Sequence, residues 1–376
     1  PEVLNDEGTY IGFDAIIGNP PYVFTRDSEF GNGFKDYVAS YIKSHKISTE
    51  NKGLNIQTNK INLFGLFIIR GLEIMNENAE FSYIIPNGIL RATTLEAIRK
   101  YILEKTKIYS IVDLDKGVFD GVTISTVILE LNKSINKNNE IKLKNKKVVN
   151  FISQSFFLKN VSYTINNFID KSTTKIIEQI KEKSYPMGDD FLFISPGIDG
   201  DKKKYVKSNK ESDLYKPLLY GKDFTNYKIE FNNNYILYDS NLLNRARNEE
   251  IFLSKRKILI QRISGGLNPL TVALDNEQYY TFNSVNNLIL HESKEHLYLV
   301  YLALLNSRLI NWYYALMFSN RSNLTVNISK TFLEKIPIKK ISTENVSDFN
   351  ISIKKILSLK QENPKADTSS LEKEID

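Results

Sequence analysis

The pattern of apolar and polar positions changes along the first 132 residues in a way that predicts alternating strands and helices. Short apolar runs are typical of buried parallel strands, and apolar residues at helical spacing are typical of helices that cover a sheet. The elements predicted here are strands at 12–18, 80–88, 108–114 and 125–132 and helices at 60–79 and 93–106. This order predicts part of a doubly wound sheet, an α/β fold.

A lysine-rich segment follows the last of these strands. Residues 133–147 hold six lysines against a single acidic residue, Glu140. A solvated hairpin and a contact to a phosphate group both fit this composition, and both interpretations stay open. The pattern then becomes irregular over 155–190, where one helix is expected at 171–183.

The second half of the sequence mixes short strands with helices, which predicts an α+β unit. Its expected elements are strands at 229–239, 256–263, 270–275 and 279–291, a helical block at 294–318, a segment at 332–341 and an amphipathic tail at 347–362. The polar pair Asn306-Ser307 is expected to break the helical block into two buried helices. Near the end, Ser369 and Glu372 have capping-box spacing, but no helix is expected after them.

The composition permits an acidic partner and excludes several kinds of site. The formal net charge is +6 and the pI is about 9.0, which suits a nucleic acid. The absence of Cys excludes disulfides, thiolate metal sites and a Cys nucleophile, and it fits a cytoplasmic protein. The three His residues do not have the spacing of metal ligands, so no metal site is predicted.

The longest apolar stretch, residues 298–318, is not expected to cross a membrane. Asn306, Arg308 and Asn311 interrupt it, and polar groups at these positions would be costly at the centre of a bilayer. No membrane partner is therefore predicted.

One short stretch indicates chemistry. The sequence "FDAIIGNPPY" places Asn19, Pro20, Pro21 and Tyr22 directly after the first predicted strand, at the edge where open α/β sheets bind ligands. The prolines fix the backbone and remove two donors, so the Asn19 side chain and the Pro20 carbonyl can both accept hydrogen bonds in one pocket. Tyr22 offers a flat face to a planar ring.

This arrangement suits an aromatic or amide-type amine. The lone pair of the adenine amine is delocalised into the ring, and two acceptors that draw its hydrogens out of the plane would direct that lone pair toward an electrophilic methyl group. No general base is needed for this chemistry. A strand that ends in an ordinary Pro-Pro turn is the alternative interpretation.

The sequence resembles the gamma-class DNA adenine N6-methyltransferases of restriction-modification systems, in the single-chain form with a carboxyl-terminal specificity domain. "NPPY" is similar to their catalytic loop, "NLFGLF" and "YIIPNGILR" to the segments that follow, and "GVFDGVTISTVILEL" to the segment that packs on the flipped base. The resemblance implies that Phe67 contacts the cofactor S-adenosylmethionine and that Phe119 packs on the target base. It also implies double-stranded DNA as partner, and a nuclease domain on the same parent chain stays open.

The sequence departs from this family at its start. The family's glycine loop and acidic cofactor residues precede the catalytic loop, and only eighteen residues precede Asn19 here. We therefore expect a carboxyl-terminal part of a Rossmann-like methyltransferase sheet, inactive alone, followed by an α+β target-recognition domain. The expected division is a partial methyltransferase domain at 1–150, a linker region at 151–190, the target-recognition domain at 191–345 and a helical tail at 346–376.

Basic clusters in the second half are the candidates for contact with DNA, since phosphates attract cations and Arg or Gln can read base edges. The candidates are Arg245, Arg247, Lys255, Arg256, Lys257, Gln261, Arg262 and Arg321. On an alternating strand, Lys255, Lys257 and Gln261 are expected on one face and Arg256 on the other. For each cluster, a solvated face is the alternative to a contact.

Three functions remain open from the sequence. The first is the target-base half of an adenine methyltransferase joined to its DNA reader. The second is a non-catalytic DNA-binding specificity module with a vestigial loop, which the three aromatic residues Tyr22, Phe67 and Phe119 argue against. The third is methylation of a protein glutamine amide, which the long basic second half argues against.

Overall fold

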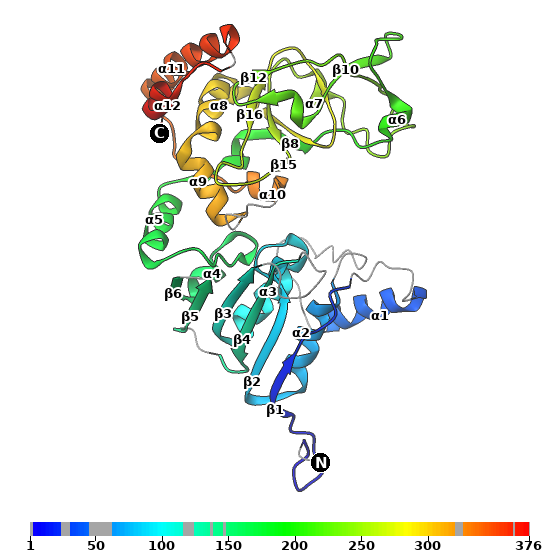
Figure 1. Cartoon of the computed structure of the whole chain (residues 1–376), viewed down its shortest axis with the longest axis vertical. Coiled ribbons are helices and arrows are strands. Elements are labelled where there is room, and N and C mark those ends of the chain that lie inside the picture. The colour runs from blue at the N-terminus through cyan, green and yellow to red at the C-terminus, as the bar shows by residue number, and fades with distance from the viewer. Residues whose placement is uncertain are drawn as a thin grey trace. The chain divides into compact units, whose positions relative to one another are not determined.

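A computed structural model of the chain describes residues 3–23, 31–44, 62–115, 124–135, 138–145, 148–319, 326–363 and 365–375. The chain divides into two compact units, Pro1–Ile176 and Ile177–Asp376, called unit 1 and unit 2 below. Figure 1 labels their helices and strands. Two of the predicted site residues, Phe119 and Arg321, lie outside the described residues.

Unit 1 is built on one mixed sheet with helices beside it. Its strands are β1 (Phe13–Gly18), β2 (Met75–Pro86), β3 (Lys107–Asp115), β4 (Thr126–Asn132), β5 (Glu140–Asn145) and β6 (Val148–Ser153). Its helices are α1 (Gly31–Ser44), α2 (Leu63–Ile74), α3 (Glu96–Lys105) and α4 (Gln154–Leu158), and α5 (Lys171–Glu182) crosses into unit 2.

The strands of unit 1 lie in the order β1-β2-β4-β3-β5-β6. β1 runs parallel to β2, and β3 runs parallel to β5, whereas β4 is antiparallel to both of its neighbours. The carboxyl ends of β1, β2 and β3 therefore meet at one edge of the sheet, where the loop after β1 begins. The strand-helix alternation that predicted an α/β sheet is confirmed here.

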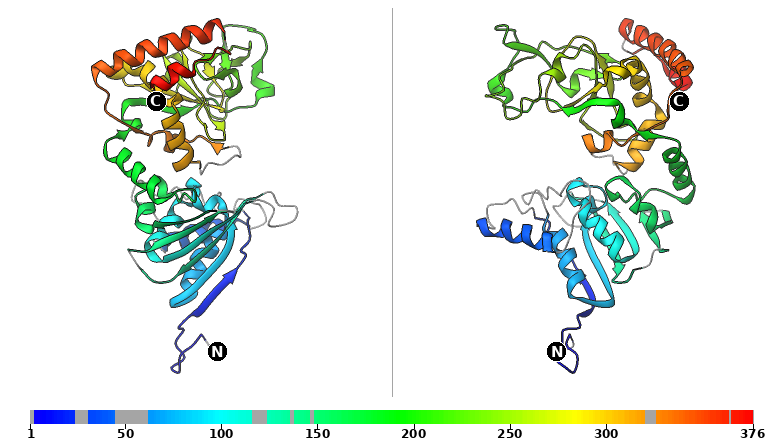
Figure 2. Two further views of the ribbon diagram at one scale, coloured as in Figure 1. Left: turned by 60° about the vertical axis from the view of Figure 1, so that its left-hand side comes forward. Right: turned by 180° about the vertical axis from the view of Figure 1, so that it is seen from behind.

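Burial alternates along these strands because α2 and α3 cover one face of the sheet (Figure 2). Phe81, Tyr83 and Ile85 of β2 are buried, and Gly71 of α2 lies so close that a Cβ there would come within 2.7 Å of the Phe81 ring. On the opposite face Ile17 of β1 is 88% exposed. The core of unit 1 thus lies between the sheet and these helices.

One boundary and one strand pairing in unit 1 differ from the sequence predictions. The helix expected at 60–79 ends at Ile74, because Met75 already pairs with Phe13 of β1 and the strand begins there. The lysine-rich segment contributes β5, which forms a hairpin with β6 and also joins the main sheet through β3. Lys142 and Lys144 are exposed, and a contact of these lysines to a phosphate group stays a prediction.

Unit 2 contains many short strands. They are β7 (Tyr185–Pro186), β8 (Phe191–Pro196), β9 (Val206–Lys207), β10 (Tyr215–Leu219), β11 (Phe224–Thr225), β12 (Lys228–Ile229), β13 (Tyr235–Leu237), β14 (Lys257–Gln261), β15 (Ile263–Ser264), β16 (Val272–Asp275), β17 (Tyr280–Thr281), β18 (Val285–Leu290), β19 (Val326–Asn327) and β20 (Pro337–Ile338). The two larger sheets have the orders β17-β10-β13-β9 and β16-β14-β18-β8.

The helices of unit 2 are α6 (Lys202–Tyr205), α7 (Glu250–Leu253), α8 (Tyr298–Asn306), α9 (Arg308–Met317), α10 (Lys330–Leu333), α11 (Thr343–Glu362) and α12 (Ser369–Ile375). Ser307 breaks the apolar block as predicted, because its side chain caps α9 by accepting a hydrogen bond from the backbone N–H of Ile310. Within the described residues, no helix combines the length and the apolar character that a membrane crossing requires.

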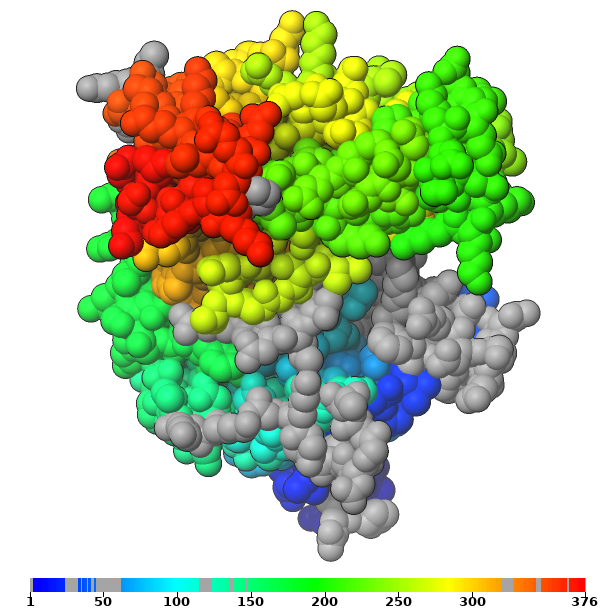
Figure 3. Space-filling model, turned by 45° about the horizontal axis from the view of Figure 1, so that its top comes forward, coloured from blue at the N-terminus to red at the C-terminus, as the bar shows by residue number. Residues whose placement is uncertain are grey.

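The end of the chain corrects one prediction. Residues 369–375 form the helix α12, although no helix was expected after the capping-box pair Ser369 and Glu372. The hydroxyl of Thr368, just before α12, donates to the Glu372 carboxylate at 2.7 Å, and the Ile375 side chain is buried at the end of the helix. In the space-filling view α11 and α12 lie side by side at the surface of unit 2 (Figure 3).

Candidate functional site

The predicted catalytic loop leaves the sheet at the carboxyl end of β1. Gly18 pairs with Tyr83 of β2, and a Cβ at Gly18 would come within 3.0 Å of the Tyr83 ring, so glycine permits this close passage. Pro20 is buried, whereas Asn19 and Pro21 are exposed. Among the described residues, the Asn19 amide has no hydrogen-bond partner. A polar group at this position is therefore accessible to a ligand.

Tyr22 is fixed in place by the sheet and by α2. Its hydroxyl donates a hydrogen bond to the backbone carbonyl of Ile84 at 3.0 Å, and its ring meets the ring of Phe64 edge to face, with centroids 6.4 Å apart. Burial raises the pKa of Tyr22 above its ordinary value. The ring is thus held by its hydroxyl end.

The start of α2 secures the other end of the loop. Asn62 caps this helix by accepting a hydrogen bond from the backbone N–H of Phe64, and the backbone N–H of Leu63 donates to the carbonyl of Val23 at 2.8 Å. Residues 19–23 are therefore tied to β2 and to α2 at once. Such a loop can hold acceptors at fixed positions, as orientation of a bound amine requires.

Two further aromatic residues were predicted for this site. Phe67 lies on α2 and is 44% exposed, although Phe64 on the same helix is only 2% exposed. Phe119 lies outside the described residues.

The turn after β2, residues 87–92, is held by a buried cation that the sequence analysis did not single out. Arg99 of α3 donates from Nη1 to the carbonyls of Ile89 at 3.2 Å and Ala92 at 2.7 Å, and from Nη2 to the carbonyl of Ser162 at 2.7 Å. Burial lowers the pKa of Arg99 to about 9. This residue supports the turn next to the candidate site and is not accessible itself.

Three of the predicted DNA contacts come together in unit 2, and we call Arg245, Arg247 and Arg262 the arginine cluster. Arg262 donates from Nε to the Asn327 side-chain oxygen at 3.1 Å and from Nη1 to the Asn283 carbonyl at 3.2 Å. Its guanidinium is therefore oriented, and its second terminal nitrogen, Nη2, has no partner among the described residues.

Arg247 interacts with Arg262 although the two positions are fifteen apart in sequence. Its Nε donates to the carbonyl of Gly197 at 3.1 Å. Burial lowers the pKa of Arg247, and the positive charges of Arg245 and Arg262 lower it further. Repulsion among three guanidinium groups is relieved by an anion, so the cluster suits a phosphate or the acceptors of a base edge.

An acidic residue limits the charge of this cluster. The backbones of Asp199 and Arg245 exchange two hydrogen bonds of 3.0 Å, and the Asp199 carboxylate accepts from the side chain of Asn283 at 3.0 Å. Among the described residues, the Arg245 guanidinium itself has no hydrogen-bond partner, and the side chain is exposed.

Lys255 and Arg256 do not join the arginine cluster. They are exposed at the start of β14, whereas Arg262 follows its end, so about 20 Å of strand separates the two positions. Gln261 is half-buried, and its side-chain amide donates to the carbonyl of Phe224 at 3.0 Å. A continuous basic strand is therefore not formed.

Lys257 was predicted as a DNA contact, and the structure shows this prediction to be wrong. β14 lies between β16 and β18, and Lys257 is fully buried. Its ammonium forms an ion pair of 2.6 Å with Asp275 and donates to the carbonyl of Phe252 at 3.0 Å. The alternation rule failed because both faces of β14 are covered, so neither face is free for DNA.

The lysines of α6 were missed by the sequence analysis. Lys202, Lys203 and Lys204 are exposed, and the ammonium of Lys202 lies 4.8 Å from the ring centroid of Tyr220 and 4.9 Å from that of Phe282. The available signal was the run "DKKKY", three cations directly after a capping Asp.

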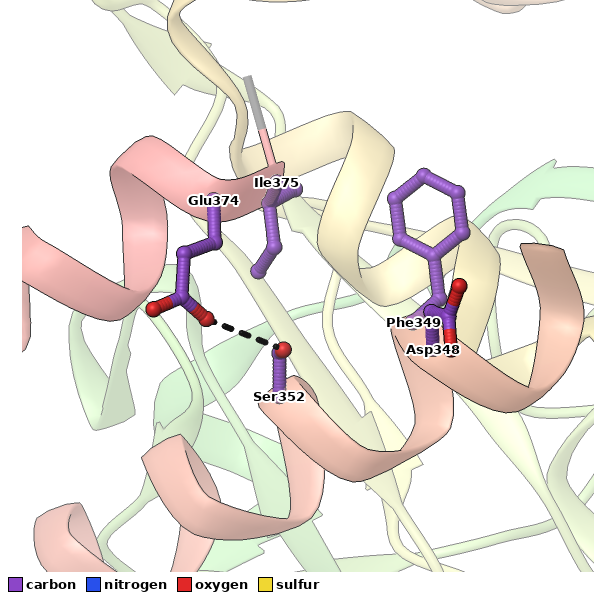
Figure 4. A pocket seen from close by; sticks show the side chains of 5 residues that line it. All are labelled: Asp348, Phe349, Ser352, Glu374 and Ile375. Carbon is purple, nitrogen blue, oxygen red and sulfur yellow. Dashed lines mark hydrogen bonds between the residues drawn. The ribbon is translucent and has the colours of Figure 1, made fainter.

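A hollow between α11 and α12 does not coincide with any of these groups. It is lined by Asp348, Phe349, Ser352, Glu374 and Ile375, and the Ser352 hydroxyl approaches the Glu374 carboxylate at 3.5 Å (Figure 4). No group of His, Asp or Glu suited to hold a metal ion occurs in the part of the chain that the structure describes.

Comparison with protein families gives two matches. Residues 2–119 match the model of the Eco57I restriction-modification methylase, and residues 216–338 match the model of the TaqI-like C-terminal specificity domain. The first match contains the predicted catalytic loop, and the second contains the arginine cluster.

Known restriction-modification enzymes are similar to parts of this chain. A protein of Methanocaldococcus jannaschii, named as a type II restriction enzyme and methyltransferase, is 23% identical over 327 residues, which cover 81% of this chain and 25% of that protein. The type II restriction enzyme and methyltransferase RM.Eco57I of Escherichia coli is 26% identical over 129 residues, or 34% of this chain and 12% of the relative. The chain thus spans a quarter or less of these two relatives.

A solved structure shows the same fold. The Type IIL restriction-modification enzyme MmeI, in complex with DNA, has a TM-score of 0.60 at 12% identity, and the match covers 95% of this chain and 51% of that chain. The expected α/β methyltransferase sheet followed by a specificity domain is confirmed. The chain thus joins a segment that matches the Eco57I restriction-modification methylase, residues 2–119, to one that matches the TaqI-like C-terminal specificity domain, residues 216–338.

Proposed function

We propose that the chain is part of a site-specific DNA adenine methyltransferase, in which unit 1 holds the target adenine and unit 2 reads the DNA. The exposed Asn19 amide carries this proposal, because it stands without a partner among the described residues beside the anchored ring of Tyr22. The family match over residues 2–119 supports methyl transfer. Adenine as the target is part of this proposal, and the two acceptors of the loop suit its exocyclic amine.

The proposed chemistry uses few protein groups. The adenine amine donates one hydrogen to the Asn19 side-chain oxygen and the other to the Pro20 carbonyl, which draws both out of the ring plane. The nitrogen lone pair would then point at the methyl group, and the amine would bond to that carbon as the carbon–sulfur bond of the donor breaks, with sulfur keeping the electron pair and the amine proton passing to water. S-adenosylmethionine supplies the methyl group when it is bound. Tyr22 stacks on the base, which is worth about 1–3 kcal/mol.

The described residues include one that fits the cofactor. Phe67 presents an aromatic ring that is 44% exposed on α2, the helix whose start secures the catalytic loop. An exposed ring suits the adenine of the cofactor, so Phe67 would hold it by stacking. Phe119 keeps its proposed role against the target base.

For unit 2 we propose that the arginine cluster, together with Lys255, Arg256 and Arg321, contacts double-stranded DNA. This role fits the family match over residues 216–338. The same proposal includes the expected functional division of the chain. It consists of a partial methyltransferase domain at 1–150, a linker region at 151–190, a target-recognition domain at 191–345 and a helical tail at 346–376. A nuclease on the parent chain is supported only by the names of the relatives.

The test is methyl transfer by the protein as its gene encodes it. We expect labelled S-adenosylmethionine to give labelled N6-methyladenine in a subset of duplexes. DNA binding without label would favour the non-catalytic specificity module, and label on a protein glutamine would favour the third function. That residues 1–376 alone leave DNA unlabelled stays a prediction.

A further inference from the structure

We propose that Lys202 binds a phosphate of duplex DNA, and that the rings of Tyr220 and Phe282 hold its ammonium in position for this contact. The proposal rests on the proposed DNA-reading function of unit 2 and adds a contact that lies on α6, outside the predicted basic clusters.

Lys202 of α6 differs from two lysines close to it in sequence, in the segment drawn in green at the right of Figure 3. Lys207 pairs with Glu211 at 3.7 Å, and Lys210 pairs with Asp213 at 2.8 Å. In contrast, Lys202 has no acidic partner among the described residues. Its neighbour Asp201 is occupied as the cap of α6, because it accepts from the backbone N–H of Lys203 at 2.9 Å.

The environment of the Lys202 ammonium is the second observation. The rings of Tyr220 and Phe282 lie 5.5 Å apart at 48° to each other, and the ammonium stands less than 5 Å from both centroids. Two ring faces attract a cation. They do not neutralise its charge, and they leave its N–H groups for another acceptor. An exposed lysine held this way loses less freedom when it binds an anion than one that moves freely in water.

Phe282 connects this lysine to the arginine cluster. The next residue, Asn283, accepts from Arg262 through its carbonyl. Gly197, whose carbonyl accepts from Arg247, packs so tightly on the Thr281 and Phe282 carbonyls that a Cβ there would clash. Lys202 and the arginine cluster thus both contact the segment Thr281–Asn283, and the proposal is that one DNA backbone contacts both.

The experiment is a salt titration of binding to duplex DNA, measured by fluorescence anisotropy on the whole protein. Lys202→Met keeps the apolar stem near the rings and removes the charge. We expect it to make the slope of log K against log salt less negative by about 0.9, on specific and random duplexes alike, because one phosphate contact is lost. Lys210→Met, which removes a paired charge from the same lobe, is expected to leave the slope unchanged.

A second variant tests the role of the ring. Tyr220→Leu is expected to weaken binding several-fold with the slope unchanged, since the charge remains but is no longer held. The proposal would be overturned if Lys202→Met left the slope unchanged while the wild type bound DNA and Arg262→Ala bound it less tightly. In that case unit 2 would still be the DNA reader. No binding by the wild type at low salt would instead overturn the proposed function of unit 2.

Discussion

The variant Lys257→Met tests whether Lys257 stabilises the core of unit 2 or contacts DNA. Its ammonium and the Asp275 carboxylate are 2.6 Å apart, and both side chains are fully buried. Asp275 also accepts from the backbone N–H groups of Glu277 at 2.8 Å and Tyr279 at 3.0 Å, so its charge stays in the core when the lysine is removed. A buried charge that loses its partner costs about 3–5 kcal/mol.

The loss of stability is measured by urea unfolding, followed by circular dichroism. We expect the free energy of unfolding of unit 2 to fall by that amount in Lys257→Met. The double variant Lys257→Met/Asp275→Asn is expected to be more stable than the single one, because a neutral amide keeps one acceptor and removes the buried charge. Lys255→Met, an exposed neighbour, serves as the control and is expected to leave stability unchanged.

The result that refutes this reasoning is specific. If Lys257→Met unfolds like the wild type and lowers the salt slope of DNA binding as Lys255→Met does, the lysine is a surface contact. Burial also lowers the pKa of Lys257, while Asp275 opposes that shift, so the ion pair rather than solvent keeps the ammonium charged.

Three further predictions concern unit 1. Tyr22→Ala should weaken methyl transfer by the loss of stacking, about 1–3 kcal/mol, measured as kcat/KM of the protein as its gene encodes it. Arg99→Met should lower the free energy of unfolding by about 3 kcal/mol, because buried carbonyls lose charged donors, whereas the exposed Lys105→Met should not. Hydrogen bonds from Thr173 and Ser172 lower the pKa of Asp170, before α5, to about 2. Asp170 therefore stabilises the fold at pH values above its ordinary pKa, and the difference from Asp170→Ala, about 1 kcal/mol at neutral pH, should disappear as the pH falls through about 2.

The sequence predicted those features that depend on neighbouring residues. The loop Asn19–Tyr22 follows its strand, and the helical block breaks at Ser307 where the polar pair stands. These features need only local pattern, since a turn or a cap is formed by residues close in the chain.

The features that the sequence did not reveal depend on distant segments. Arg247 and Arg262 approach each other through the carbonyls of Gly197 and Asn283, which no local pattern connects. Lys257 looked like an exposed cation, but it is buried against Asp275, its ion-pair partner from another strand, and the carbonyl of Phe252. The helix α12 forms at the chain end because Ile375 finds a buried position there.

The central claim is that Asn19 orients the target amine. The measurement is single-turnover methyl transfer by the Asn19→Ala variant. Its affinity for duplex DNA is determined on the same preparation, and the protein without the substitution is the reference. The account predicts that methyl transfer is abolished while the dissociation constant for DNA changes less than twofold, because the Asn19 acceptor acts only in the chemical step. Methyl transfer at the parental rate, or an equal loss of binding and rate, would contradict it.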